Sequence, residues 1–124
     1  MARMDAYVVI VAEYNHGPTG VQKNAIDYLG DEVRQKPAAF MGYGGVDKAR
    51  AVEQLWLSLV ELEIAPTRKA LHIAGDAFRA LASAGGSFDA HPRLAEGAAA
   101  PSDQLAWWAE ALRSAPLPPR RLGR

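Results

Sequence analysis

The chain has 124 residues, 49% of them hydrophobic, and its 14 acidic and 14 basic residues give a formal net charge of zero. This balance gives no reason to expect nucleic acid or an acidic membrane surface as a partner. Cysteine is absent, which excludes disulfides, thiolate catalysis and cysteine-ligated metals.

The length suits a single domain or part of one. The three histidines lie far apart in the sequence and lack metal-ligand spacing. No stretch approaches the ~18 consecutive apolar residues that a membrane span needs. The first apolar run is also too short for a secretory signal. We therefore expect a soluble, cytoplasmic protein without a membrane partner.

Residues 5–29 read as a strand, a polar turn and a helix. Tyr7–Val11 is a short run rich in Val and Ile, which predicts a strand over about 6–12 that is covered on both faces, as in parallel sheets. The apolar spacing that follows predicts a helix over about 20–30. In open α/β sheets, ligands bind just past the carboxyl ends of the strands, where residues 13–20 lie.

The polar turn is the first candidate site. Glu13 and Asn15 are polar, and the glycines of the turn allow close backbone approach and positive φ. A flat heteroaromatic ligand needs backbone donors, fixed polar groups and little bulk. The residues alone favour an ordinary strand-to-helix loop over a ligand site. His16 is a lone loop histidine, and we do not expect proton transfer by it.

A second strand and turn follow a charged connector over residues 31–36. Pro37–Tyr43 predicts a strand, with proline tolerated only at its start. Gly44 and Gly45 then form a turn that either needs glycine for its own geometry or lets a ligand approach the backbone. The two interpretations are compatible, because both require the same lack of side chains.

The next segment, residues 46–62, predicts the best amphipathic helix of the chain. Residues 70–74 predict a short strand, and residues 77–84 predict one or two helical turns. Residues 85–101 are rich in Ala, Gly and Pro and predict an exposed loop.

A final helix is expected to begin at Ser102 as its N-cap. Trp107 lies off the apolar face of this helix, so it is either an isolated surface residue or a contact for a partner subunit. Residues 115–124 are rich in Pro and Arg and predict a disordered tail.

Two stretches carry a resemblance to a known family. AEYNHGPTGVQKNAIDYL resembles the PEYN-x-x-x-x-G-x-x-KNA-x-D segment of the NADPH-dependent FMN reductases, a flavodoxin-like family. KPAAFMGYGGVDKARAVEQL is similar to the family's next strand and glycine turn. Two departures stand out: Ala12 and Thr19 occupy positions where the family usually has proline.

The resemblance implies roles for particular residues. Glu13, Tyr14, Asn15 and His16 would hold one edge of the flavin ring. Gly44 and Gly45 would lie at its pyrimidine end. Arg50 matches the arginine of the family's GGxRAxxQL pattern, which implies a salt bridge or a subunit contact.

The resemblance covers residues 5–114 and only the C-terminal part of the family domain. It implies an α/β fold, a partial flavodoxin-like three-layer sandwich. The chain would supply strands 3, 4 and 5 of the family's 2-1-3-4-5 order with their flanking helices. The first two strands and the loop that binds the FMN phosphate would be absent. Tyr7–Val11 would then have an open edge, a template for pairing with another chain.

The implied function is that of a flavin-dependent oxidoreductase. Hydride would pass from NAD(P)H to FMN and on to an acceptor such as a quinone, with FMN and NADPH as cofactors and a homo-oligomer as the expected assembly. No catalytic acid, base or nucleophile is expected, because the flavin supplies the chemistry. The alternative is a truncated, non-catalytic flavodoxin-like remnant that acts as an oligomerising or interaction module.

Overall fold

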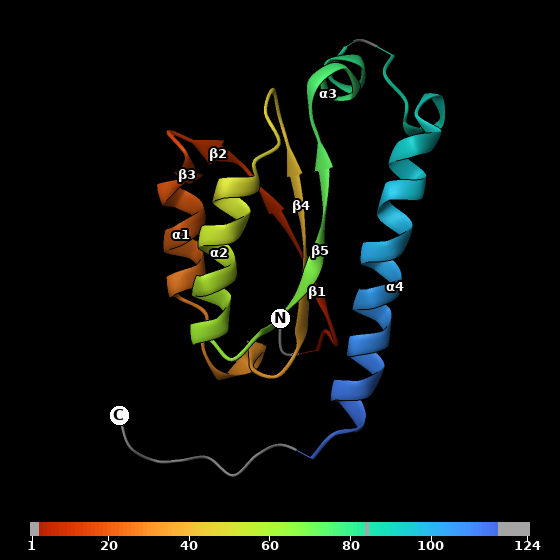
Figure 1. Ribbon diagram of the computed structural model, residues 1–124. Coiled ribbons are helices and arrows are strands. Elements are labelled where there is room, and N and C mark those ends of the chain that lie inside the picture. Colours follow the sequence, from red (N-terminus) through yellow and green to blue (C-terminus); the bar gives the residue numbers. More distant parts are fainter. Residues whose placement is uncertain (1–2, 84, 117–124) are drawn as a thin grey trace.

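A three-stranded parallel sheet lies between helices in the computed structural model, which describes residues 3–83 and 85–116 (Figure 1). The strands β1 (Tyr7–Val11), β4 (Pro37–Tyr43) and β5 (Ala65–Ile73) pair in the order β1-β4-β5. Two helices, α1 (Gly20–Asp27) and α2 (Ala49–Glu61), cover one face. The other face is covered by α4 (Pro92–Ser114). The predicted α/β class and its three layers are confirmed.

The core lies between the sheet and the α1/α2 layer. Phe40 of β4 packs there against Leu55 and Leu59, which form the apolar stripe of α2. All three side chains are almost completely removed from solvent. Full burial of each contributes about 1.5–3 kcal/mol to folding, so this stripe fixes the position of α2 on the sheet.

One face and one edge of β1 remain open. Tyr7, Val9 and Val11 pack into the core, whereas Val8 (59% exposed) and Ile10 (53% exposed) point to the opposite face. That face belongs to the α4 layer, but α4 packs chiefly against β4 and β5. Within the described residues no strand pairs with the outer edge of β1, as the sequence analysis predicted.

Short elements complete the connections. A two-stranded antiparallel hairpin, β2 (Glu13–Tyr14) and β3 (Gly17–Pro18), lies between β1 and α1. The charged connector contains a 3-10 turn, η1 (Asp31–Val33), and the predicted helical turns near residue 80 form α3 (Gly75–Ala82). A second 3-10 turn, η2 (Phe88–Ala90), precedes α4.

Strand β5 is longer than predicted. It begins at Ala65 and not at residue 70, and the pairing with β4 shifts register between Ala38 and Phe40. Pro66 falls in this irregular first part, which is tolerable because β5 is an edge strand of the described sheet. The exposed Arg68 and Lys69 interrupt the apolar pattern and concealed this half of the strand.

The C-terminal helix also starts earlier than predicted. The expected loop over residues 85–101 is wrong from Pro92 onward, where α4 begins with proline in its first turn. Ser102 is therefore interior to the helix and not its N-cap. Pro101 lies inside α4 and is buried, so packing of the Ala-rich helix on the sheet outweighs the backbone hydrogen bond that proline removes.

The predicted helix over 46–62 is three residues shorter at its start than expected, because α2 begins at Ala49. Of the predicted tail over 115–124, residues 117–124 lie outside the described residues. Among the residues that the structure does describe, no helix is both long and apolar enough to cross a bilayer.

Replacing Leu55 by Ala tests the α2 stripe. Leu55 is fully buried in the core, so truncation removes its packing and leaves a cavity, and the free energy of unfolding should fall by about 2–5 kcal/mol. Urea unfolding followed by circular dichroism measures this loss. The matched variant Leu57→Ala, on the exposed side of α2, should change the monomer's stability far less; equal losses would contradict the assigned core.

Candidate functional site

Two loops follow neighbouring strands at the carboxyl end of the sheet. The hairpin β2–β3 follows β1, and the loop over residues 44–48 follows β4 (Figure 1). The six residues predicted for the site all fall within these loops: Glu13, Tyr14, Asn15, His16, Gly44 and Gly45. Parallel strand ends place the two loops at the position where open α/β sheets bind ligands.

The first loop is a tight hairpin. Glu13 pairs with Pro18, and Tyr14 pairs with Gly17. The two turn residues between them, Asn15 (φ 50°) and His16 (φ 68°), both have positive φ, which is the pattern of a two-residue type I′ turn. The side chain of Tyr14 is 71% exposed, and Asn15 and His16 are exposed too. The hairpin tip therefore presents one aromatic ring and two polar side chains.

The positive φ predicted for the glycines of this loop is wrong. Asn15 and His16, and not Gly17 or Gly20, adopt positive φ. Gly17 instead lies close to α2: a Cβ there would be 3.1 Å from Oε1 of Gln54. The glycine lets the hairpin rest closely on the helix.

Glu13 is the one buried side chain of the first loop. Only 4% of it is exposed, and its Oε1 accepts a hydrogen bond from Nη1 of Arg50 at 2.9 Å. Its Oε2 accepts a longer one, 3.4 Å, from the backbone N–H of Ala51. The salt bridge expected for Arg50 is thus present, and its partner is a residue that the sequence analysis assigned to the ligand.

The second loop needs its first glycine. Gly44 is buried with φ 153°, and a Cβ there would collide with the side chain of Lys48. Gly45 is exposed and has open space around it. The loop is held to β5 by His72, whose Nδ1 lies 2.5 Å from the carbonyl oxygen of Asp47. Because a carbonyl only accepts, that nitrogen carries the proton.

A cavity of about 460 Å³ opens beside the second loop. Its lining combines the bare backbone of Gly45, the cationic residues Lys48 and Arg50, one acidic residue, Asp47, and the start of α3 at Gly75. Backbone groups and cations of this kind suit an anionic, hydrogen-bonding ligand. The hairpin residues 13–16 do not line this cavity. No group of three or more His, Asp or Glu side chains among the described residues could hold a metal ion.

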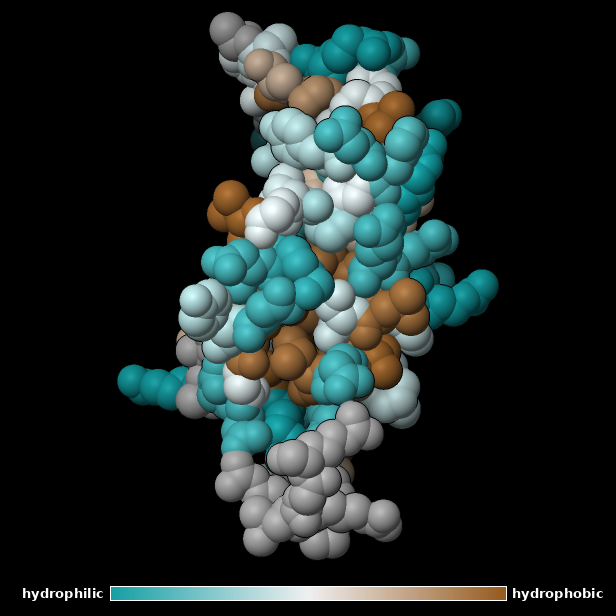
Figure 2. Space-filling model, turned by 90° about the vertical axis from the view of Figure 1, so that its left-hand side faces the viewer, coloured by the Kyte–Doolittle hydropathy of each residue, from teal (hydrophilic) through white to brown (hydrophobic). Residues whose placement is uncertain are grey.

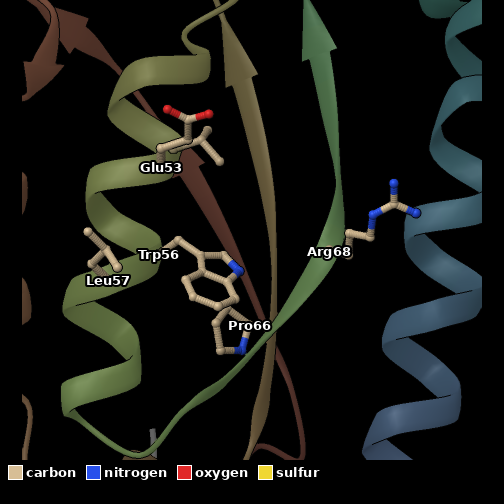
Figure 3. Close-up of a pocket in the computed structure, with 6 residues that line it drawn as sticks. Glu53, Trp56, Leu57, Pro66 and Arg68 are labelled. Carbon is tan, nitrogen blue, oxygen red and sulfur yellow. The ribbon is translucent and has the colours of Figure 1, made fainter.

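A second cavity lies away from these loops, between α2 and the edge of β5. It measures about 470 Å³ and is largely apolar. In Figure 3 the ring of Trp56 lies over Pro66, whereas Arg68 points away toward α4. None of the predicted site residues lines it, so we assign it to the surface of the α2 layer and not to the ligand site.

Comparison with known proteins agrees with this geometry. The sequence model of NADPH-dependent FMN reductase matches residues 1–78, well over half of the chain. The chain belongs to this family. The match contains both loops of the candidate site and all of β1, α1, β4 and α2.

Individual FMN reductases are similar over parts of their length. An NAD(P)H-dependent FMN reductase from a Nectria species is 38% identical over 86 residues, which are 65% of this chain and 43% of that protein. Another, from Pseudomonas aeruginosa, is 36% identical over 96 residues, 73% of this chain and 48% of that protein. The chain spans less than half the length of these relatives.

A solved structure shares the fold. FerB from Paracoccus denitrificans, a flavoenzyme NAD(P)H:(acceptor) oxidoreductase, superimposes with a TM-score of 0.65 at 26% identity. The superposition covers 86% of this chain and 63% of that one. The similarity to this flavoenzyme confirms the flavodoxin-like architecture.

One departure from the FMN reductase pattern has a structural explanation. Thr19 stands where the family often has proline, and it is the N-cap of α1. Its side-chain oxygen accepts a hydrogen bond from the N–H of Gln22 at 3.1 Å. Capping of this kind satisfies a helix-end donor and stabilises the helix by about 1 kcal/mol.

Replacing Gly44 by Ala tests the geometry of the second loop. An alanine must adopt an unfavourable φ and displace Lys48, so the free energy of unfolding should fall by about 1–3 kcal/mol. Urea denaturation measures the change. Gly45→Ala is the control, since that site is open and lacks a positive φ; an equal loss there would contradict the special role of Gly44.

Proposed function

We propose that this chain contributes the flavin-ring site of an NAD(P)H-dependent FMN reductase, which transfers hydride from NAD(P)H to FMN and on to an acceptor such as a quinone. The observation that supports this most directly is that an exposed hairpin tip and a glycine loop with free space at Gly45 both lie at the carboxyl end of a parallel sheet. The family membership supports the same cofactors.

The residues present fit a flavin ring. Tyr14 and Asn15 project from the hairpin and offer an aromatic face and an amide, and Gly45 offers an unobstructed backbone. When bound, FMN supplies the hydride chemistry, and the protein supplies orientation.

The α1/α2 face is our proposed homo-oligomer surface. Large apolar side chains are exposed along both helices, with Val21 on α1, Tyr28 at its C-cap, and Leu57 and Val60 on α2. Figure 2 views this side and shows hydrophobic atoms gathered mostly in the lower half of the described surface. The apolar cavity beside Trp56 is also lined by residues of α2, including Leu57. Exposed apolar patches of this kind mark association surfaces.

A second candidate function is supported by the open side of β1. Val8 and Ile10 are exposed on one face, and an apolar cavity of about 290 Å³ lies between β1 and α1 on the other. An unpaired apolar strand is a template for pairing, so a non-catalytic interaction module is the alternative. A folded chain that does not quench FMN fluorescence at any concentration would favour this module over the enzyme.

Replacing Tyr14 by Ala tests the flavin site. Loss of an aromatic contact worth about 0.5–1.5 kcal/mol should raise the dissociation constant for FMN up to about tenfold, without a matching loss of stability, because the side chain is exposed. A fluorescence-quenching titration measures the constant. Phe88→Ala, an aromatic of comparable exposure (60%) on η2, should leave it unchanged; an unchanged constant in the Tyr14 variant would count against the site.

Replacing Leu57 by Glu tests the oligomer surface. Leu57 is 68% exposed on α2, so a charge is harmless in a monomer but is costly to bury between subunits. Analytical ultracentrifugation should show a smaller assembly than the unmodified chain. Ala106→Glu, at an exposed position of α4 in the opposite layer, is the control. The surface would be misassigned if Leu57→Glu left the mass of the assembly unchanged.

A further inference from the structure

The N-terminus of α2 lacks its own stabilising acid. Lys48 is the N-cap, adopts a left-handed conformation and makes no side-chain capping hydrogen bond, and the first turn contains no acidic residue. Helix N-termini present unpaired N–H groups and favour a negative charge. The carboxylate of Glu13 supplies that charge from another element, through Arg50 Nη1 and the N–H of Ala51.

Glu13 in turn depends on α2. A carboxylate that is 4% exposed must be paired, because an unpaired buried charge is costly. Arg50 is the side chain that forms a salt bridge of 2.9 Å with it, whereas the exposed His16 lies 3.9 Å away. The short N–H donation from Arg50 therefore accounts for most of the compensation.

The hairpin makes a second contact with the same helix. Nε2 of Gln54, one turn beyond Arg50, donates to the carbonyl oxygen of His16 at 2.8 Å. Gly17 allows this close approach, as its missing Cβ leaves room for the Gln54 side chain. The hairpin is thus attached to α2 at its first strand and at its turn.

The hairpin needs this attachment. Each of its strands has only two residues, and a short two-stranded ribbon is not stable alone in water. Its turn also holds two non-glycine residues, Asn15 and His16, at positive φ, which is an unfavourable conformation for them. Contacts from outside the hairpin must offset these costs.

We propose that Arg50 and Gln54 are positioning residues that hold the 13–18 hairpin, through Glu13 and the His16 carbonyl, in the shape that presents Tyr14 and Asn15 to the flavin ring. Neither side chain needs to touch the ligand for this role. The inference rests on the proposed flavin site, but the claim that Arg50 and Gln54 hold the hairpin on α2 can be tested without a ligand.

The test compares two arginines. Arg50→Gln removes the partner of Glu13, and Arg50→Lys keeps a positive charge. Arg34→Gln is the control, because Arg34 forms a salt bridge of similar length, 2.7 Å, with the more exposed Glu63, away from the hairpin. Amide hydrogen exchange of residues 13–18 and the dissociation constant for FMN are measured for each variant of the full chain.

Arg50→Gln should accelerate exchange in residues 13–18 and raise the FMN dissociation constant, each by about tenfold or more, as expected for loss of a charged hydrogen bond. Arg50→Lys should restore part of both. Arg34→Gln should leave both within about twofold of the unmodified chain, even where it lowers the melting temperature.

Unchanged exchange in the Arg50→Gln hairpin would overturn the proposal. Faster exchange with an unchanged FMN constant would also overturn it, since the hairpin shape would then not matter for binding. If the unmodified chain bound no FMN, the proposed function would fail; the exchange data would then show separately whether Arg50 anchors the hairpin.

Discussion

The buried carboxylate of Glu13 joins the β2–β3 hairpin to helix α2. It accepts a hydrogen bond from the Arg50 side chain and a longer one from the Ala51 N–H in the first turn of α2, and so connects the hairpin that follows β1 to that helix. The apolar stripe of α2 fixes that helix on the sheet, and the second loop leads directly into it. Both loops of the proposed flavin site therefore take their positions from one rigid helix, as a preorganised site requires.

Local patterns predicted the first two strand–helix units well. The Val/Ile run of β1, the proline-led strand β4 and the spacing in α2 each carry their periodicity in consecutive residues. The later elements were harder to predict because tertiary packing decides them. Pro101 inside α4 and the charged residues of β5 break the local pattern, and burial against the sheet overrides what they indicate.

The sequence predicts which residues form the two loops, but it does not predict which side chains contact one another. The sequence predicts that Glu13 lies in a turn after the first strand, where the structure has it, but its partner Arg50 is 37 residues away. No local spacing reveals such a contact. Likewise, positive φ was expected at glycines, yet Asn15 and His16 adopt it, because a two-residue hairpin turn tolerates Asn there. Only the fold shows which residues meet.

The account depends most on whether the carboxyl end of this sheet binds a flavin. The most direct measurement is an FMN fluorescence-quenching titration of the purified chain, with its mass determined in the same solution. Saturable quenching that weakens in the Tyr14→Ala variant is the predicted result. A folded chain whose addition leaves FMN fluorescence unchanged would contradict the account.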